Sequence, residues 1–237
     1  MPAEGAGPYN YYTGDTGRVS TLPMVLLITP SSIKKDEPQV WCDLFEVGLE
    51  RLHLRKTDSD PTQVGKLLEK LPEKYHSKVV LHRYPELLDK FNLAGYHHRS
   101  NEDLQKNVNG TSSRSFHYLE ELKSNSESLD YCFFGPVYES ISKKGYLPRV
   151  SLPELGAALH SNHKKDQRSQ VFALGGVRRK KIPELFDLGF DGVALFGSIW
   201  GKKDPVLAFE KYLYIERSTW GKKEKEQSLI KRLFAPE

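Results

Sequence analysis

The sequence predicts an α/β protein built as a single (β/α)8 barrel. Three observations support this fold: strand-like apolar runs recur about every 25 residues, helical stretches separate them, and eight such units fill residues 24–215. A doubly wound sheet is the alternative, but that fold usually has a glycine-rich turn after its first strand. The first turn here, Thr29–Ser32, lacks a GxGxxG pattern, so the barrel is favoured.

The expected strands are short apolar runs rich in β-branched residues. They cover Met24–Pro30, Arg51–Lys56, Lys78–Arg83, Gly95–Arg99, Ser112–Ser115, Tyr131–Val137, Gln170–Val177 and Asp191–Ile199. The expected helices have one apolar face and cover Val40–Leu49, Thr62–Leu71, Pro85–Phe91, Tyr118–Asn125, Leu152–Ser161, Lys181–Leu188 and Pro205–Ile215. The connection Ser100–Thr111 predicts a weak helix at best.

Both ends of the chain differ from the repeating part. Residues 1–23 are rich in Gly, Pro, Thr and Tyr and have no periodicity, so we interpret them as a leader, a vector-derived extension or a misassigned start. The alternative is a native arm that pads the barrel or a dimer. Residues 216–237 are rich in lysine and are expected to form a basic, solvated helix or tail.

The composition excludes several classes of protein. Of the 237 residues, 38% are hydrophobic and 28% charged, which permits a substantial core and excludes wholesale disorder. Cys42 and Cys132 are the two cysteines, so no disulfide framework is expected and a reducing cytoplasm is the predicted setting. No apolar run approaches the roughly 20 residues of a membrane helix. The net charge of +4 suits an anionic substrate but is too weak and scattered for nucleic acid.

The ends of the last two predicted strands suggest a phosphate site. In such barrels the reactive groups lie at the carboxyl ends of the strands. Glycines there let backbone N–H groups approach a phosphate, although glycines also occur simply in tight turns. The candidate phosphate ligands are Gly175, Gly176, Gly197 and Ser198, and the cations expected over the same mouth are Arg55, Lys56 and Lys143.

Histidines also gather at strand ends. They are His53, His82, His97, His98 and His117. A ring of histidines could hold a transition metal, as in metal-dependent hydrolases. The metal ligands of those enzymes include carboxylates and a His-x-His on the first strand, where this chain has Ile28-Thr29-Pro30. We therefore disfavour a metal site and expect His53 to form hydrogen bonds within the barrel.

Several motifs together resemble the thiamine phosphate synthase and TenI superfamily of small (β/α)8 barrels. They are Leu52–Lys56, Gly95–His98, Ser115–His117, Asp130–Tyr138, Ser140–Lys143, Ala173–Val177 and Gly189–Ala194. The resemblance covers most of residues 24–214. It implies a cytoplasmic thiamine-biosynthesis enzyme that acts on a small phosphorylated thiazole, and a homodimer.

The synthase pattern of this superfamily is only partly present. The resemblance implies that Arg55 and a nearby lysine hold a pyrimidine diphosphate, but the lysine stands at Lys56, one residue early. Ser140, Ser142 and Lys143 keep the hydroxyls and the cation of a Thr-x-Thr-Lys segment that grips the diphosphate.

The carboxylates that hold Mg²⁺ in the synthases look absent here. His82-Arg83 stands where Asn-Asp is expected after the third strand. After the fourth strand, Glu102 and Asp103 are nearby but out of register. A diphosphate without its metal is a poor leaving group, because its charge is not neutralised in the transition state.

The tautomerase pattern fits better. TenI-like tautomerases convert a carboxythiazole phosphate to its aromatic tautomer without a metal, using a histidine in an Arg-Ser-x-His segment, which matches Arg114–His117 here. The resemblance implies that His117 moves the proton and that Ser115 holds the substrate carboxylate or phosphate; otherwise His117 is simply a histidine at a helix start. We thus expect a tautomerase with no cofactor. The alternatives are an Mg²⁺-dependent thiamine phosphate synthase using Asp103 or Glu102, and a regulator that binds thiazole or thiamine phosphates without turnover.

Overall fold

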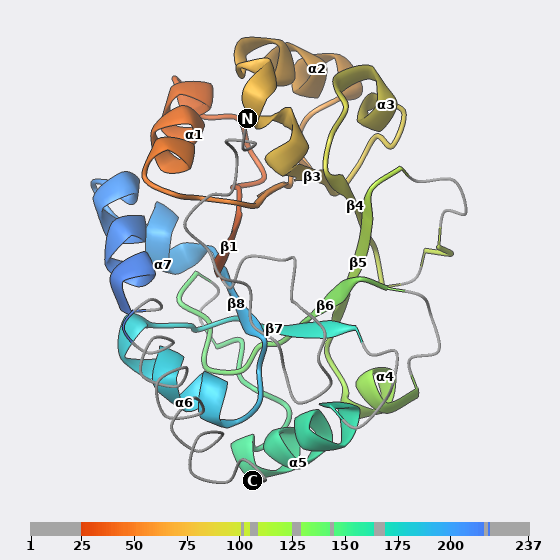
Figure 1. Ribbon diagram of the computed structural model, residues 1–237, viewed down its shortest axis with the longest axis vertical. Helices are drawn as coiled ribbons and strands as arrows, with labels where there is room; N and C mark the ends of the chain where they lie inside the picture. The colour runs from red at the N-terminus through yellow and green to blue at the C-terminus, as the bar shows by residue number, and fades with distance from the viewer. Residues whose placement is uncertain are drawn as a thin grey trace, which may run out of the picture.

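The computed structural model describes residues 25–100, 102–104, 109–124, 129–142, 145–163, 169–215 and 218. Eight parallel strands follow one another in chain order and close into a barrel, which the helices surround (Figure 1). The predicted (β/α)8 barrel is therefore confirmed. The expectations for residues 1–23 and for nearly all of 216–237 fall outside the described residues.

All eight predicted strands are present, most of them shorter than predicted. They are β1 (Val25–Ile28), β2 (Leu52–Leu54), β3 (Val79–Leu81), β4 (Gly95–His98), β5 (Thr111–Phe116), β6 (Tyr131–Phe134), β7 (Gln170–Leu174) and β8 (Gly192–Leu195). The eighth was predicted to reach Ile199, but the chain turns into helix at Gly197. Most of the predicted site residues thus lie in the loops after the strands.

The helices occupy the predicted connections. They are α1 (Glu37–Glu46), α2 (Pro61–Lys70), α3 (Leu87–Phe91), α4 (Leu119–Ser124), α5 (Leu152–His163), α6 (Ile182–Asp187), α7 (Gly197–Trp200) and a final helix over 205–215, with short 3-10 turns η1 (Glu73–Lys78) and η2 (Arg179–Lys181). A capping box between Asp60 and Gln63 fixes the start of α2. The described part of the connection 100–111 is not helical, so the weak helix is not found there. None of the described helices is long and apolar enough to cross a membrane.

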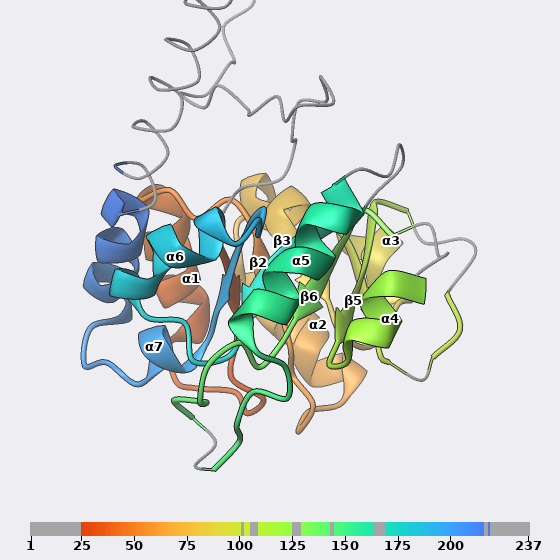
Figure 2. The ribbon, with the colours of Figure 1, turned by 90° about the horizontal axis from the view of Figure 1, so that it is seen from below.

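Alternation along the strands divides the core into two layers. Outward residues such as Leu27 and Cys132 pack beneath the helices, whereas inward residues of β1, β6, β7 and β8 fill one side of the barrel. That inner cluster consists of Leu26, Ile28, Tyr131, Phe133, Phe172 and Ala194. Figure 2 shows the barrel from the side, with the loop after β6 and helix α7 both at its lower end. This end carries the carboxyl ends of the strands.

Lys56 is held at this end of the barrel in a buried ion pair. Its Nζ lies 2.6 and 2.7 Å from the two carboxylate oxygens of Glu37 and donates to the carbonyls of Pro30 and Ser32. Both charged side chains are at most 2% exposed. The expectation that Lys56 binds substrate is therefore wrong. Its ammonium group instead ties the loop after β1 and the start of α1 to the end of β2.

Replacing Lys56 with alanine should strongly destabilise the protein, because Glu37 would remain buried without a partner. Such a loss costs about 3–5 kcal/mol of unfolding free energy, measured by urea denaturation. Lys74→Ala is the matched control: its pair with Glu46 is exposed, with side chains 66% and 64% accessible, and solvent screens such a pair so that its loss costs little stability. The double variant Lys56→Met/Glu37→Leu should regain most of the loss. Equal costs for Lys56→Ala and Lys74→Ala would contradict this account.

Candidate active site

A cavity of about 330 Å³ opens at the carboxyl ends of the strands. Apart from Lys56, every predicted catalytic or phosphate-binding residue that the structure describes lines it: Arg55, Ser115, His117, Ser140, Ser142, Gly175, Gly176, Gly197 and Ser198. Lys143 lies outside the described residues. Segments up to 143 residues apart in the chain therefore converge on one cavity, from Arg55 to Ser198. We call it the mouth cavity.

The side of the mouth cavity formed after β7 and β8 has the backbone geometry of an anion site. Gly175 and Gly176 have φ angles of 88° and 67°, which favour glycine. A Cβ on Gly176 would lie 2.4 Å from the carbonyl oxygen of Glu139, so the chains approach too closely for a side chain. Gly197 and Ser198 are in the first turn of α7, where N–H groups have no acceptor within the helix. These groups are available to an anionic ligand.

Ser140 and Ser142 are supplied by the loop after β6. The N–H of Ser140 donates to the carbonyl of Tyr146 at 2.9 Å, which closes this loop on itself. Ser142 lies against Gly197, where an added Cβ would be 3.1 Å from the Cβ of Ser142. Ser142 is thus placed beside the start of α7.

His117 directly follows β5 and is fixed at both its backbone and its ring. Its N–H donates to the Glu121 carboxylate at 2.6 Å, and its ring Nδ1 lies 2.5 Å from the carbonyl oxygen of Gly135. Because a carbonyl oxygen only accepts, Nδ1 of His117 donates its N–H to Gly135. The other ring nitrogen, Nε2, carries the lone pair in the neutral tautomer that this hydrogen bond selects.

Ser115 lies two residues before His117 on β5 and belongs to a hydrogen-bonded chain. Its Oγ is 2.9 Å from Nε2 of His97, whose Nδ1 is 2.8 Å from Oγ of Ser113. Burial, together with the charges of His98 and Arg114, lowers the pKa of His97 to about 3, so this imidazole is neutral. These hydrogen bonds from Ser113 through His97 fix the hydroxyl of Ser115 at the cavity wall.

His97 is one of three histidines gathered inside the barrel. Nδ1 of His53 is 3.0 Å from Nε2 of His82, and Nε2 of His53 is 2.8 Å from the hydroxyl of Tyr131. Burial and the neighbouring His97 hold the pKa values of His53 and His82 well below the ordinary value. The expected hydrogen bonding of His53 within the barrel is confirmed. His82 and His97 also line the mouth cavity.

His98 and the acidic residues after β4 do not face this cavity. His98 packs edge-on against Tyr96, on the outer side of β4. The carboxylate of Glu102 accepts hydrogen bonds from the Arg99 N–H at 3.2 Å and the Tyr96 hydroxyl at 3.4 Å, and lines a separate surface hollow. Asp103 is exposed. Neither carboxylate is placed to hold a metal in the mouth cavity.

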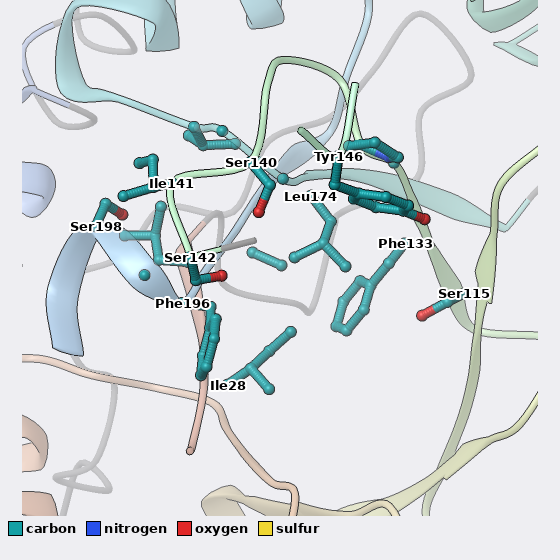
Figure 3. Close-up of a pocket in the computed structure, with 18 of the residues that line it drawn as sticks. Ile28, Ser115, Phe133, Ser140, Ile141, Ser142, Tyr146, Leu174, Phe196 and Ser198 are labelled. Atoms are coloured by element: carbon teal, nitrogen blue, oxygen red, sulfur yellow. The ribbon is translucent and has the colours of Figure 1, made fainter. Parts of the chain in front are cut away.

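The two ends of the mouth cavity differ in chemistry. Figure 3 shows Ser115 on one side and Ser142 and Ser198 on the other, with Ile28 and Phe133 between them. The sequence did not single out Phe133 or Tyr146 as lining residues. Alternation on β6 could have indicated Phe133, whereas Tyr146 lies in a loop with no periodic signal. The cavity thus combines a side lined by glycines and serines, an apolar floor and a histidine–serine side.

The comparisons with known proteins place the fold and the motifs in one family. The family model described as thiamine monophosphate synthase matches residues 25–199, well over half of the chain. The chain belongs to this family. A thiamine-phosphate synthase of Bacteroides fragilis is 25% identical over 185 residues, which cover 72% of this chain and 89% of the relative. A second, from Bacteroides thetaiotaomicron, is 32% identical over 88 residues, 37% of this chain.

The structural comparison agrees with the family assignment. The crystal structure of thiamine phosphate pyrophosphorylase from Bacteroides thetaiotaomicron superposes with a TM-score of 0.71 and 29% identity, covering 82% of this chain and 98% of that one. The aligned stretches span only 35% and 42% of the first two curated relatives. Membership of the family is therefore established, and the reaction catalysed is the subject of the proposal below.

Proposed function

We propose that this family member is a thiazole tautomerase, which converts a carboxythiazole phosphate to its aromatic tautomer. The observation that carries the proposal is the placement of His117: its Nδ1–H is held by the Gly135 carbonyl, and its ring lines the mouth cavity. A histidine fixed in one tautomer beside a substrate cavity is suited to moving a proton at neutral pH.

The anionic groups of the substrate fit the charges of the cavity. The phosphate is assigned to the amides near Gly176 and Ser198 with the hydroxyls of Ser140 and Ser142, because these groups donate hydrogen bonds and carry no negative charge. Arg55 lines the same cavity and adds a guanidinium for a carboxylate or phosphate. This arrangement places the thiazole ring over the apolar floor, toward β5.

The proposed step is a proton transfer with no change in composition. Nε2 of His117 takes a proton from one carbon of the non-aromatic ring system, the ring electrons shift, and the imidazolium returns a proton at another carbon. The Gly135 carbonyl keeps the ring oriented and stabilises the imidazolium while it exists. Ser115, whose hydroxyl is fixed by His97, is assigned to hold the substrate carboxylate next to the reacting carbon.

The Mg²⁺-dependent synthase reaction is less well supported by the residues present. Mg²⁺ requires oxygen ligands, usually carboxylates and the oxygens of phosphates. Among the described residues that line the mouth cavity, none is an aspartate or a glutamate. The side-chain donors of this cavity among the described residues are three histidines, Arg55 and the hydroxyls of serines and Tyr146, which do not fit Mg²⁺, and we derive no step through that ion. The homodimer and the cytoplasmic location remain predictions from the family resemblance.

Replacing His117 with asparagine should abolish most of the isomerisation, because asparagine keeps hydrogen bonding but cannot carry a proton. The expected loss in kcat is about 10²–10⁴-fold, or roughly 3–5.5 kcal/mol of barrier. Affinity for thiazole phosphate, measured by calorimetry, should change only a few-fold. His160→Asn is the control, since this helix α5 histidine bonds to the Gly156 carbonyl outside the cavity. Near-parental turnover by His117→Asn would defeat the assignment, and binding without turnover by the parent would favour a regulator.

Isomerisation should proceed equally well with EDTA or with added Mg²⁺, because it needs no metal-assisted leaving group. The same protein mixed with hydroxymethylpyrimidine diphosphate, thiazole phosphate and Mg²⁺ should release pyrophosphate no faster than the reaction without protein. Both rates can be followed by chromatography of the products. Pyrophosphate release that requires protein and Mg²⁺ would instead establish the synthase reaction, and would require a carboxylate such as that of Glu102 to move into the mouth.

A further inference from the structure

We infer that His53, His82 and His97 form a binding site for a divalent d-block cation such as Zn²⁺ or Co²⁺. Each histidine offers a ring nitrogen, and these atoms lie within 4.8 Å of one another. His53 lies on β2, His82 directly follows β3, and His97 lies on β4, so the three come from neighbouring strands. The inference does not involve His117 and does not rest on the proposed proton transfer, although His97 also contacts Ser115.

Two of the ligand atoms are already close to metal-binding positions. Nδ1 of His53 and Nε2 of His82 are 3.0 Å apart. Zn–N bonds of about 2.0–2.1 Å with tetrahedral angles place ligand nitrogens about 3.3 Å apart. A cation can therefore bind both nitrogens after the rings of His53 and His82 move only slightly apart. In the bound state the metal takes the place of the shared proton, which moves to the other nitrogen of the histidine that carried it, and each of the two nitrogens gives its lone pair to the ion.

His97 supplies the third nitrogen after a rotation of its ring. Its ring stacks on that of His82 with the centroids 4.3 Å apart, and each of its nitrogens is bonded to a serine hydroxyl. To reach the ion, His97 must give up one serine hydrogen bond and keep the other. A neutral hydrogen bond contributes little net free energy because water replaces it when it breaks, so a metal–imidazole bond offsets this loss.

The outer contacts are those that orient histidine ligands in metal sites. The remaining nitrogen of His53, Nε2, lies 2.8 Å from the Tyr131 hydroxyl, and its N–H donates a hydrogen bond to that oxygen when Nδ1 binds the ion. Ser113 or Ser115 holds the remaining nitrogen of His97 in the same way. Phe133, stacked on His97 at 4.8 Å, provides an apolar wall. These contacts favour a defined site over a loose group of histidines.

Access and ligand type narrow the choice of cation. His82 and His97 line the mouth cavity, so an ion can enter from the solvent, and the fourth position faces the cavity for water or a ligand. Neutral imidazoles suit Zn²⁺, Co²⁺ or Ni²⁺ and bind Mg²⁺ poorly. The site therefore belongs to a different metal class from the carboxylate site that a synthase needs.

The test uses the full-length protein without a histidine tag, stripped with EDTA and desalted. Titration with Co²⁺ should give visible d–d absorption that saturates at one ion per chain, and Zn²⁺ should abolish it by displacement. Mg²⁺ at the same concentrations should not displace Co²⁺. These spectra report the ligand field itself and require no activity measurement.

Three variants identify the ligands. His97→Gln and His82→Gln should weaken Co²⁺ binding by more than the roughly 10–100-fold lost when an outer partner is removed. Tyr131→Phe, which removes only the hydroxyl next to His53, should cost about 10–100-fold. His98→Gln is the matched control for His97→Gln, since it changes the adjacent histidine on the outer face of β4. His117→Asn should bind Co²⁺ normally, which separates this inference from the proposed function.

The inference is overturned if the parent protein shows no saturable Co²⁺ spectrum. It is also overturned if His97→Gln, shown by circular dichroism to be folded, binds Co²⁺ as tightly as His98→Gln does. Loss of binding in His117→Asn with retention in His82→Gln would place the ion elsewhere in the mouth and contradict the site proposed here.

Discussion

The constraint on which the structure depends is that every side chain pointing into the closed barrel must either be packed or have a hydrogen-bond partner. Inward residues of β1, β6, β7 and β8 meet this requirement with apolar and aromatic groups. The inward positions on the β2–β4 side instead carry His53, His82 and His97, which are satisfied by one another and by Tyr131, Ser113 and Ser115. The barrel interior is therefore polar on one side.

The mouth cavity likewise has two sides that differ in their chemical groups. The loops after β6, β7 and β8 contribute glycines and serines that suit an anion, while the β5 side contributes His117 and Ser115. The loops after β1 and β2 are held down by the buried pair of Lys56 and Glu37. A lysine that stabilises the rim in this way cannot also contact substrate, so the positive charge that the described part of the chain offers to an anion in the cavity is that of Arg55, supplemented by the backbone amides.

The sequence predicted the barrel and most of the cavity because both depend on local patterns. Strand period, the glycines after β7 and β8, and the segment ending at His117 are all readable within a few residues. The buried position of Lys56 could not be predicted in this way, because it depends on Glu37, which lies 19 residues away and which no local pattern marks as buried. The grouping of the histidines needed the register of three strands: Leu81 pairs with Tyr96, which brings His82 beside His97 and turns His98 outward.

The central claim is that one cavity holds the phosphate near Gly176 and Ser198 and moves a proton with His117. A crystal structure with bound carboxythiazole phosphate tests it most directly. The account predicts the phosphate at the amides after β7 and β8, the ring over Ile28 and Phe133, and Nε2 of His117 in contact with a ring carbon that gains or loses the proton. A phosphate bound elsewhere, or a thiazole whose reacting carbons lie beyond the reach of the His117 ring, would contradict it.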